Sequence, residues 1–121
     1  MTLNEYQGKA MSTCKESCHN YTYMAEGLVG EAGEFFSKVV KAVRKEEAYV
    51  LDNNLYGKDE LKAGLKAELG DCAWFLAGIA SVFGWTLEEV CQGNVDKLAA
   101  RQKNNTIVGS GDGVTAEERK D

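Results

Sequence analysis

Apolar residues recur through most of the chain at the three- and four-residue spacing of an α-helix. No strong alternation of polar and apolar residues, which would indicate a strand, interrupts them. The chain also contains no proline. We therefore predict an all-α protomer of about four helices. Their expected ranges are 3–17, 22–47, 59–83 and, after a capping box that begins at Thr86, 87–104.

Turn-forming residues mark the ends of these helices. Gly84 follows the third helix and suits the left-handed position after a helix C-terminus. Residues 48–58, AYVLDNNLYGK, are expected to connect the second and third helices. Residues 1–104 then form a single all-α domain, and residues 105–121, rich in glycine and charge, are expected to form a flexible C-terminal tail.

Length and composition narrow the class of protein. The 121 residues are 44% hydrophobic, enough for one domain with a modest core. A formal net charge of −5 argues against nucleic-acid binding, which needs a basic surface. No run of 18 apolar residues is present to span a membrane, and the N-terminus lacks the shape of a signal peptide, so we expect a cytoplasmic protein. The four cysteines are expected to be free thiols.

The segment from Cys72 to Phe83, CAWFLAGIASVF, is apolar on nearly every side. A helix of this kind needs cover all round, which four helices of one chain cannot supply. We therefore expect at least a homodimer, formed through the second and third helices. Trp74 lies away from the main apolar arc of its helix, and we interpret it as a subunit-interface residue rather than as a platform for a base.

Two pairs of carboxylates stand on the borders of apolar helix faces. Glu31 and Glu34 are three residues apart in the second helix, and Glu68 and Asp71 repeat that spacing in the third. Residues three apart face the same side of a helix. If the two helices pack antiparallel, the two pairs face each other. Four converging carboxylates repel one another unless a cation joins them, and Mg²⁺ prefers such oxygen ligands.

These acids have two other interpretations. Glu34 also has the spacing for an ion pair with Lys38, four residues later, so one acidic pair alone could be an ordinary helix edge. A di-iron bundle would need Glu-x-x-His motifs, and the one histidine, His19, does not have that spacing. The two acidic pairs together, with Gly30, Gly33 and Gly70 beside them, favour a metal site. Helix-interior glycines cost stability, and close approach of a helix or ligand would explain them.

Basic residues accompany the acids. Lys38, Lys41 and Lys45 continue the Glu31 and Glu34 face of the second helix, while Asn94, Lys97 and Arg101 share one face of the fourth. Taken alone, these are solvated polar faces. Beside a metal cluster they are suited to donate to phosphate oxygens that the metal does not reach. The ligand expected from this combination is a metal-chelated polyphosphate.

Three segments resemble the MazG-like, all-α nucleoside triphosphate pyrophosphohydrolases. They are GLVGEAGEFFSKVVK, ELGDCAWFLAGIASVFGWTLEEV and NVDKLAARQ, and the resemblance runs from about residue 24 to 104. It implies hydrolysis of a nucleoside or deoxynucleoside triphosphate to the monophosphate and pyrophosphate. It also implies a dimer, or a dimer of dimers, with a four-helix-bundle core. The implied ligands of Mg²⁺, or of Mn²⁺, are Glu31, Glu34, Glu68 and Asp71.

The expected chemistry is attack of water on the α phosphorus, with Glu34 and Glu68 as the candidate catalytic carboxylates. Other activities of the same superfamily stay open, namely a dUTPase or dCTPase and a phosphoribosyl-ATP pyrophosphohydrolase. A non-catalytic nucleotide-binding helical module is the alternative from another class. The candidate substrate contacts are Lys38, Asn94, Lys97 and Arg101.

Overall fold

The computed structural model describes residues 1–104, so the expected flexible tail, 105–121, lies outside the described residues. The described chain is mainly helical, as predicted, with four α-helices and one small sheet. The elements, in chain order, are α1 (Leu3–Met11), a short 3₁₀ helix (Glu16–Cys18), α2 (Tyr21–Arg44), β1 (Ala48–Leu51), β2 (Asn54–Gly57), α3 (Asp59–Val82) and α4 (Leu87–Lys103).

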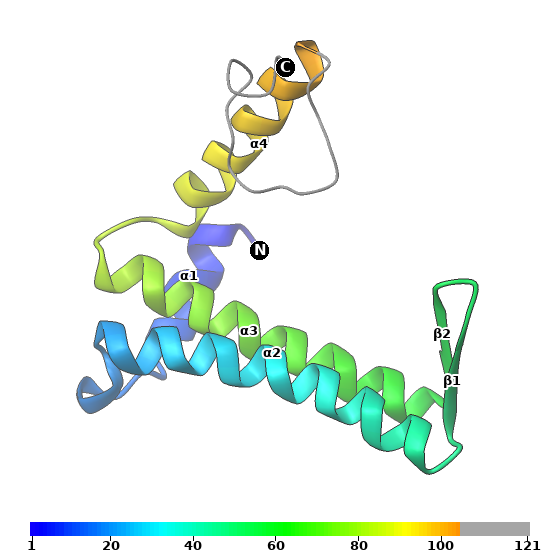
Figure 1. Ribbon diagram of the computed structural model, residues 1–121. Coiled ribbons are helices and arrows are strands. Elements are labelled where there is room, and N and C mark those ends of the chain that lie inside the picture. Colours follow the sequence, from blue (N-terminus) through cyan, green and yellow to red (C-terminus); the bar gives the residue numbers. More distant parts are fainter. Residues whose placement is uncertain (105–121) are drawn as a thin grey trace.

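The two long helices, α2 and α3, lie side by side and run antiparallel, with the hairpin of β1 and β2 at one end of the pair (Figure 1). This is the antiparallel packing under which the two acidic pairs were expected to face each other. At the other end, α1 packs against α3, and α4 turns away from α3 through a bend of 100°. Gln7 of α1 holds this corner: its side chain donates to Trp85 O at 3.0 Å and accepts from Leu87 N at 2.7 Å.

Glycine lets α2 and α3 approach each other closely. A Cβ added at Gly78 would overlap the sulfur of Met24, which is fully buried, and a Cβ at Gly27 would overlap the ring of Phe75. The glycines that the sequence singled out, Gly30, Gly33 and Gly70, have open space where a Cβ would stand. The close approach is therefore real, but within this chain it occurs at different glycines from those expected.

The first helix is shorter than predicted. It ends at Met11 rather than near residue 17, and a 3₁₀ turn follows at Glu16–Cys18. The Ser12 hydroxyl donates to Lys9 O, and the Thr13 hydroxyl donates to Ala10 O, both at 2.6 Å. Serine and threonine compete in this way with backbone hydrogen bonds, and helices often end where they do.

The connection between α2 and α3 is a β-hairpin, which the sequence pattern did not predict. Asp52 and Asn53 form the two-residue turn, with φ of 51° and 64°. Positive φ at both turn positions matches the right-handed twist of paired strands. Tyr49 and Tyr56 face each other across the strands, and their rings stack with centroids 5.1 Å apart. The predicted turn residues were right, but the short flanking apolar runs did not reveal the strands.

Two predicted helix ends are confirmed. The Thr86 side chain accepts from Glu89 N at 3.1 Å, which caps the start of α4. Gly84 has φ of 75° after α3. The Gly84 and Trp85 N–H groups donate back to Ser81 O and Ala80 O, the pattern of a Schellman motif. These caps fix the corner between α3 and α4.

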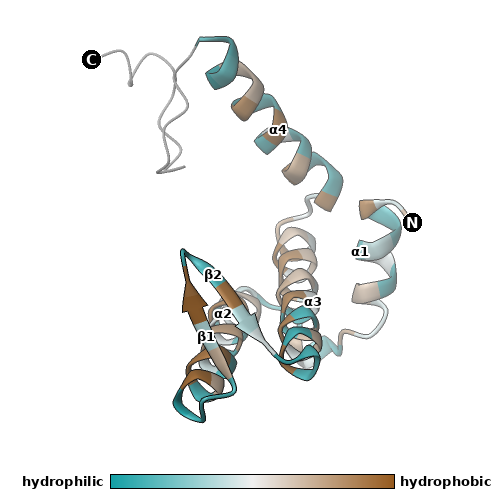
Figure 2. Cartoon of the chain, turned by 90° about the vertical axis from the view of Figure 1, so that its right-hand side faces the viewer, coloured by the Kyte–Doolittle hydropathy of each residue, from teal (hydrophilic) through white to brown (hydrophobic). Residues whose placement is uncertain are grey.

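Large apolar side chains stay uncovered on the helix pair. Figure 2 shows hydrophobic residues spread along α2 and over the hairpin. Val29 and Phe36 of α2 are 74% and 66% exposed, and Leu69 and Leu76 of α3 are also exposed. Among residues 1–104, no single helix is long and apolar enough to span a membrane; α3 and α4 pass such a test only as one bent pair.

Candidate metal centre and substrate site

Three carboxylates meet near the middle of the α2–α3 pair. Glu31, Glu68 and Asp71 each offer one carboxylate oxygen, and these three oxygens lie within 4.8 Å of one another. Glu31 and Glu68 are half-buried, and Asp71 is exposed. The antiparallel packing of two helices, each with acids three residues apart, therefore brings together three of the four predicted metal ligands.

The fourth predicted ligand, Glu34, lies outside this group. Met24 is opposite Gly78, Gly27 is opposite Phe75, and the Lys38 side chain is the nearest neighbour of Gly64. In each of these opposing pairs the two residue numbers sum to 102, which defines the register of α2 against α3. The same register places Glu34 at the level of Glu68. Its side chain is nevertheless exposed, and its carboxylate does not join the other three.

Lys38 pairs with the cluster and not with Glu34. Its Nζ lies 3.4 Å from Glu68 Oε1, and the Glu68 side chain is only 12% exposed. Within residues 1–104 this is the one ion pair between side chains, so the alternative Glu34–Lys38 pair does not form. The predicted substrate contact Lys38 is therefore brought directly beside the three carboxylates.

The cluster is electrostatically incomplete. With both carboxylates ionised, neither Glu31 nor Glu68 can donate a hydrogen bond, and Glu68 Oε2 is buried without a partner among the described residues. The pKa of Glu31 is raised above its ordinary value. The largest cause is hydrogen bonding to Glu68, followed by loss of solvent and by the negative charges of Asp71, Glu68 and Glu34. A proton or a cation is needed to stabilise this arrangement.

An aromatic hollow of about 320 Å³ opens on one side of the carboxylates. Glu31 and Asp71 form part of its wall, and the remaining lining residues are Tyr23, Trp74 and Phe75. The Trp74 indole N–H donates to Ala10 O at 3.1 Å and to Thr13 Oγ1 at 2.9 Å. Trp74 therefore packs against α1 and the turn after it in its own chain. The subunit-interface role that the sequence suggested for this residue stays a prediction.

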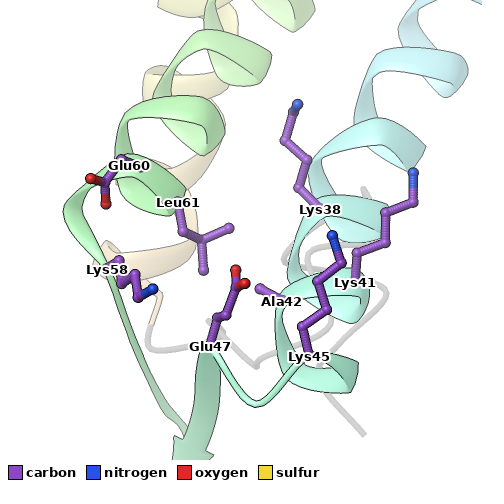
Figure 3. A pocket seen from close by; sticks show the side chains of 8 residues that line it. All are labelled: Lys38, Lys41, Ala42, Lys45, Glu47, Lys58, Glu60 and Leu61. Atoms are coloured by element: carbon purple, nitrogen blue, oxygen red, sulfur yellow. The ribbon is translucent and has the colours of Figure 1, made fainter.

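A lysine pocket of about 270 Å³ opens on the other side, toward the hairpin. We use this name for the hollow lined by Lys38, Lys41, Ala42, Lys45, Glu47, Lys58, Glu60 and Leu61. Figure 3 shows the lysines of α2 extending toward earlier turns of that helix, and the Glu47 carboxylate standing between α2 and α3. The helix periodicity revealed the lysines of α2, but nothing in the sequence indicated that Lys58 and Glu47 would join them.

The predicted contacts from the fourth helix lie elsewhere. Asn94, Lys97 and Arg101 are on α4, which extends away from the α2–α3 pair (Figure 1). Asn94 and Lys97 are exposed, and Arg101 is 4% exposed. Within one copy of the chain, the structure does not bring these three residues to the carboxylates.

Comparison with known proteins points to one family. The model of the MazG nucleotide pyrophosphohydrolase domain matches residues 19–106, which include all four predicted metal ligands. A curated relative, the Gene 37 protein of Mycobacterium phage L5, is 38% identical over 97 residues, which are 80% of this chain and 79% of the phage protein. No solved structure matches the chain at a significant level.

Proposed function

This chain belongs to the MazG nucleotide pyrophosphohydrolase domain family, and we propose that it hydrolyses nucleoside or deoxynucleoside triphosphates to the monophosphate and pyrophosphate with the help of Mg²⁺. The observation that carries the proposal is the meeting of the Glu31, Glu68 and Asp71 carboxylates, with the Lys38 amino group beside them. Negative oxygens for a cation and a positive group for phosphate then stand side by side.

The donor set fits a hard divalent cation. Three carboxylate oxygens within 4.8 Å of one another can share one ion, and Mg²⁺ bound by a few carboxylates keeps positions free for water and phosphate oxygens. One oxygen of Glu68 is buried and has no partner within residues 1–104, which gives an independent reason to expect a positive charge there. When bound, the cation would offset the negative charge that develops on the phosphate oxygens. Mn²⁺ has similar ligand preferences and is the expected substitute.

The chain's own residues supply position and proton transfer. Glu31, Glu68 and Asp71 would hold the cation near the middle of the α2–α3 pair. Lys38 would move from Glu68 to a phosphate oxygen, an exchange of one anionic partner for another. Glu34 is an exposed residue of α2 that lies outside the cluster, at the level of Glu68. From there it would accept the proton of an attacking water. Glu68 would act chiefly by holding the cation.

We place the contacts from α4 in a second copy of the chain. The exposed apolar residues Val29, Phe36 and Leu69 leave a face of the helix pair for a homodimer or a homotetramer to cover. The open space beside Gly30 and Gly70 lets another helix approach the carboxylates. Asn94 and Lys97, which are exposed on α4, would then donate to the substrate held by the partner's carboxylates.

A subunit-mixing experiment tests this arrangement. Asp71→Asn and Lys97→Ala should each be inactive, and mixing the two variants should restore turnover, because each mixed dimer contains one site with neither substitution. A monomeric mass by light scattering at micromolar concentration, or no recovery on mixing variants that do associate, contradicts the shared site.

The hydrolytic activity is tested with conservative variants. Glu34→Gln and Asp71→Asn should abolish Mg²⁺-dependent pyrophosphate release, while the helical circular dichroism stays unchanged. Glu26→Gln is the matched control, because it removes an exposed charge from α2 outside the cluster. Unchanged turnover in Asp71→Asn would refute the proposal. A nucleotide screen that includes dUTP, dCTP and phosphoribosyl-ATP separates the activities of the superfamily.

A further inference from the structure

The lysine pocket is a concentrated positive region in an acidic protein. The whole chain has a formal net charge of −5, whereas the pocket is lined by four lysines and two glutamates, a formal charge of +2. The amino groups of Lys41, Lys45 and Lys58 have no ion-pair partner among the described residues. Like charges gathered without partners favour an anionic ligand that binds them together.

The pocket is continuous with the candidate metal centre. Lys38 lines the pocket, and its Nζ is also 3.4 Å from Glu68 Oε1 in the carboxylate cluster. Lys41 and Lys45 follow at the three- and seven-residue spacing that keeps side chains on one helix face. An anion that extends from the carboxylates toward the hairpin therefore meets Lys38 first and the other lysines next.

The two ends of a nucleoside triphosphate differ in charge, and the two sides of the carboxylate cluster differ in the same way. One side has the aromatic hollow with Tyr23 and Trp74, and the other has the lysine pocket. Terminal phosphates carry most of the negative charge of the substrate. Electrostatic complementarity directs them to the lysines.

We propose that the lysine pocket is the pyrophosphate subsite, which attracts the terminal phosphates of the substrate and retains pyrophosphate after hydrolysis. This inference rests on the proposed function for its role in turnover, but the binding of pyrophosphate itself does not require catalysis. Glu47 limits the affinity, because its carboxylate stands in the same pocket as the lysines and repels an anion.

Calorimetric titration with inorganic pyrophosphate, in chelator and at low salt, tests the subsite without metal or turnover. Lys41→Ala and Lys45→Ala should each weaken binding about three- to fivefold, which is the scale of one partly exposed charge interaction. Glu47→Gln should strengthen it by a similar factor, an effect of opposite sign that damage to the fold would not produce. Lys9→Ala, on α1, is the charge-matched control and should leave the affinity unchanged.

The results separate this inference from the proposed function. Asp71→Asn should lose turnover and still bind pyrophosphate in chelator, and in the active protein Lys45→Ala should relieve inhibition by pyrophosphate. Equal affinities in the wild type, Lys41→Ala and Lys45→Ala would overturn the subsite, even if triphosphates are hydrolysed. Absence of any pyrophosphate binding by the folded wild type would also overturn it.

Discussion

A methyl group added at Gly27 tests the helix contact that sets the geometry of the candidate metal centre. Gly27 lies one helical turn before Glu31 on α2, and its missing side chain leaves room for the ring of Phe75 on α3. That ring cannot move aside easily. It stands edge-on to the Trp74 ring, with the two ring centroids 5.0 Å apart, and its centroid is 5.8 Å from that of the Tyr23 ring. Gly27→Ala must therefore push α2 away from α3.

The expected cost follows from two opposing effects. Overpacking a tight contact costs about 1–3 kcal/mol, whereas replacing glycine by alanine inside a helix gains about 1 kcal/mol. The difference is a net loss of unfolding free energy of about 0–2 kcal/mol, and the deep overlap of the added Cβ with the Phe75 ring puts Gly27→Ala near the upper end of this range. Since the unfolding entropy of a chain of this size is about 0.25 kcal/mol/K, each kcal/mol lowers Tm by roughly 4 °C.

Thermal and urea unfolding followed by circular dichroism measure this loss. Gly8→Ala is the control, because a Cβ at Gly8 on α1 meets no atom within 4 Å. This variant should show only the stabilisation that alanine gives over glycine inside a helix. Replacing Phe75 by leucine in the Gly27→Ala background should recover part of the stability, since the two sites share one contact. Separation of the helices should also weaken Mg²⁺ binding. A Gly27→Ala variant as stable as the wild type would refute the packing described for α2 and α3.

Two further predictions concern the corner after α3 and the acidic cluster. Gly84→Ala should lower stability by about 1 kcal/mol, measured by urea unfolding, because φ of 75° is strained for any residue with a Cβ. The raised pKa of Glu31 means that its contribution to the stability of the metal-free protein is fully present at acid pH and is lost as pH rises through that raised pKa. In chelator, Glu31→Gln should therefore raise Tm at neutral pH and flatten the dependence of Tm on pH. Added Mg²⁺ should raise Tm only in the wild type. The same dependence of Tm on pH in Glu31→Gln and the wild type would contradict the electrostatics of the acidic cluster.

The sequence predicted the helix pair and most of the cluster because both depend on local spacing. Apolar periodicity located α2 and α3 to within three residues, and acids three residues apart on each helix had to share a face. The exact partners depend on the register of the two helices. That register is set by the buried contacts of Gly27 and Gly78, and sequence periodicity alone does not distinguish these glycines from Gly30 or Gly70.

The features that could not be predicted are those set by tertiary geometry. Nothing in the helix pattern gives the 100° bend between α3 and α4, which carries Lys97 away from the carboxylates of its own chain. The hairpin was hidden because four-residue strands are too short for a pattern of alternation to stand out. Glu34 has the correct register, yet it is exposed and its carboxylate does not join the other three, because a side-chain rotamer is not determined by helical position alone.

The order of residues along the α2–α3 pair carries a consequence for substrate orientation. From the α1 end toward the hairpin, the paired helices present the aromatic hollow, then the carboxylates, then Lys38 and the rest of the lysine pocket. With the proposed cation at the carboxylates and the proposed pyrophosphate subsite among the lysines, the hollow with Tyr23 and Trp74 would be the space for the nucleoside. Antiparallel packing thus converts a linear order of residue types into a direction for the ligand, and a shift of register by one turn would separate Lys38 from Glu68 and abolish that direction.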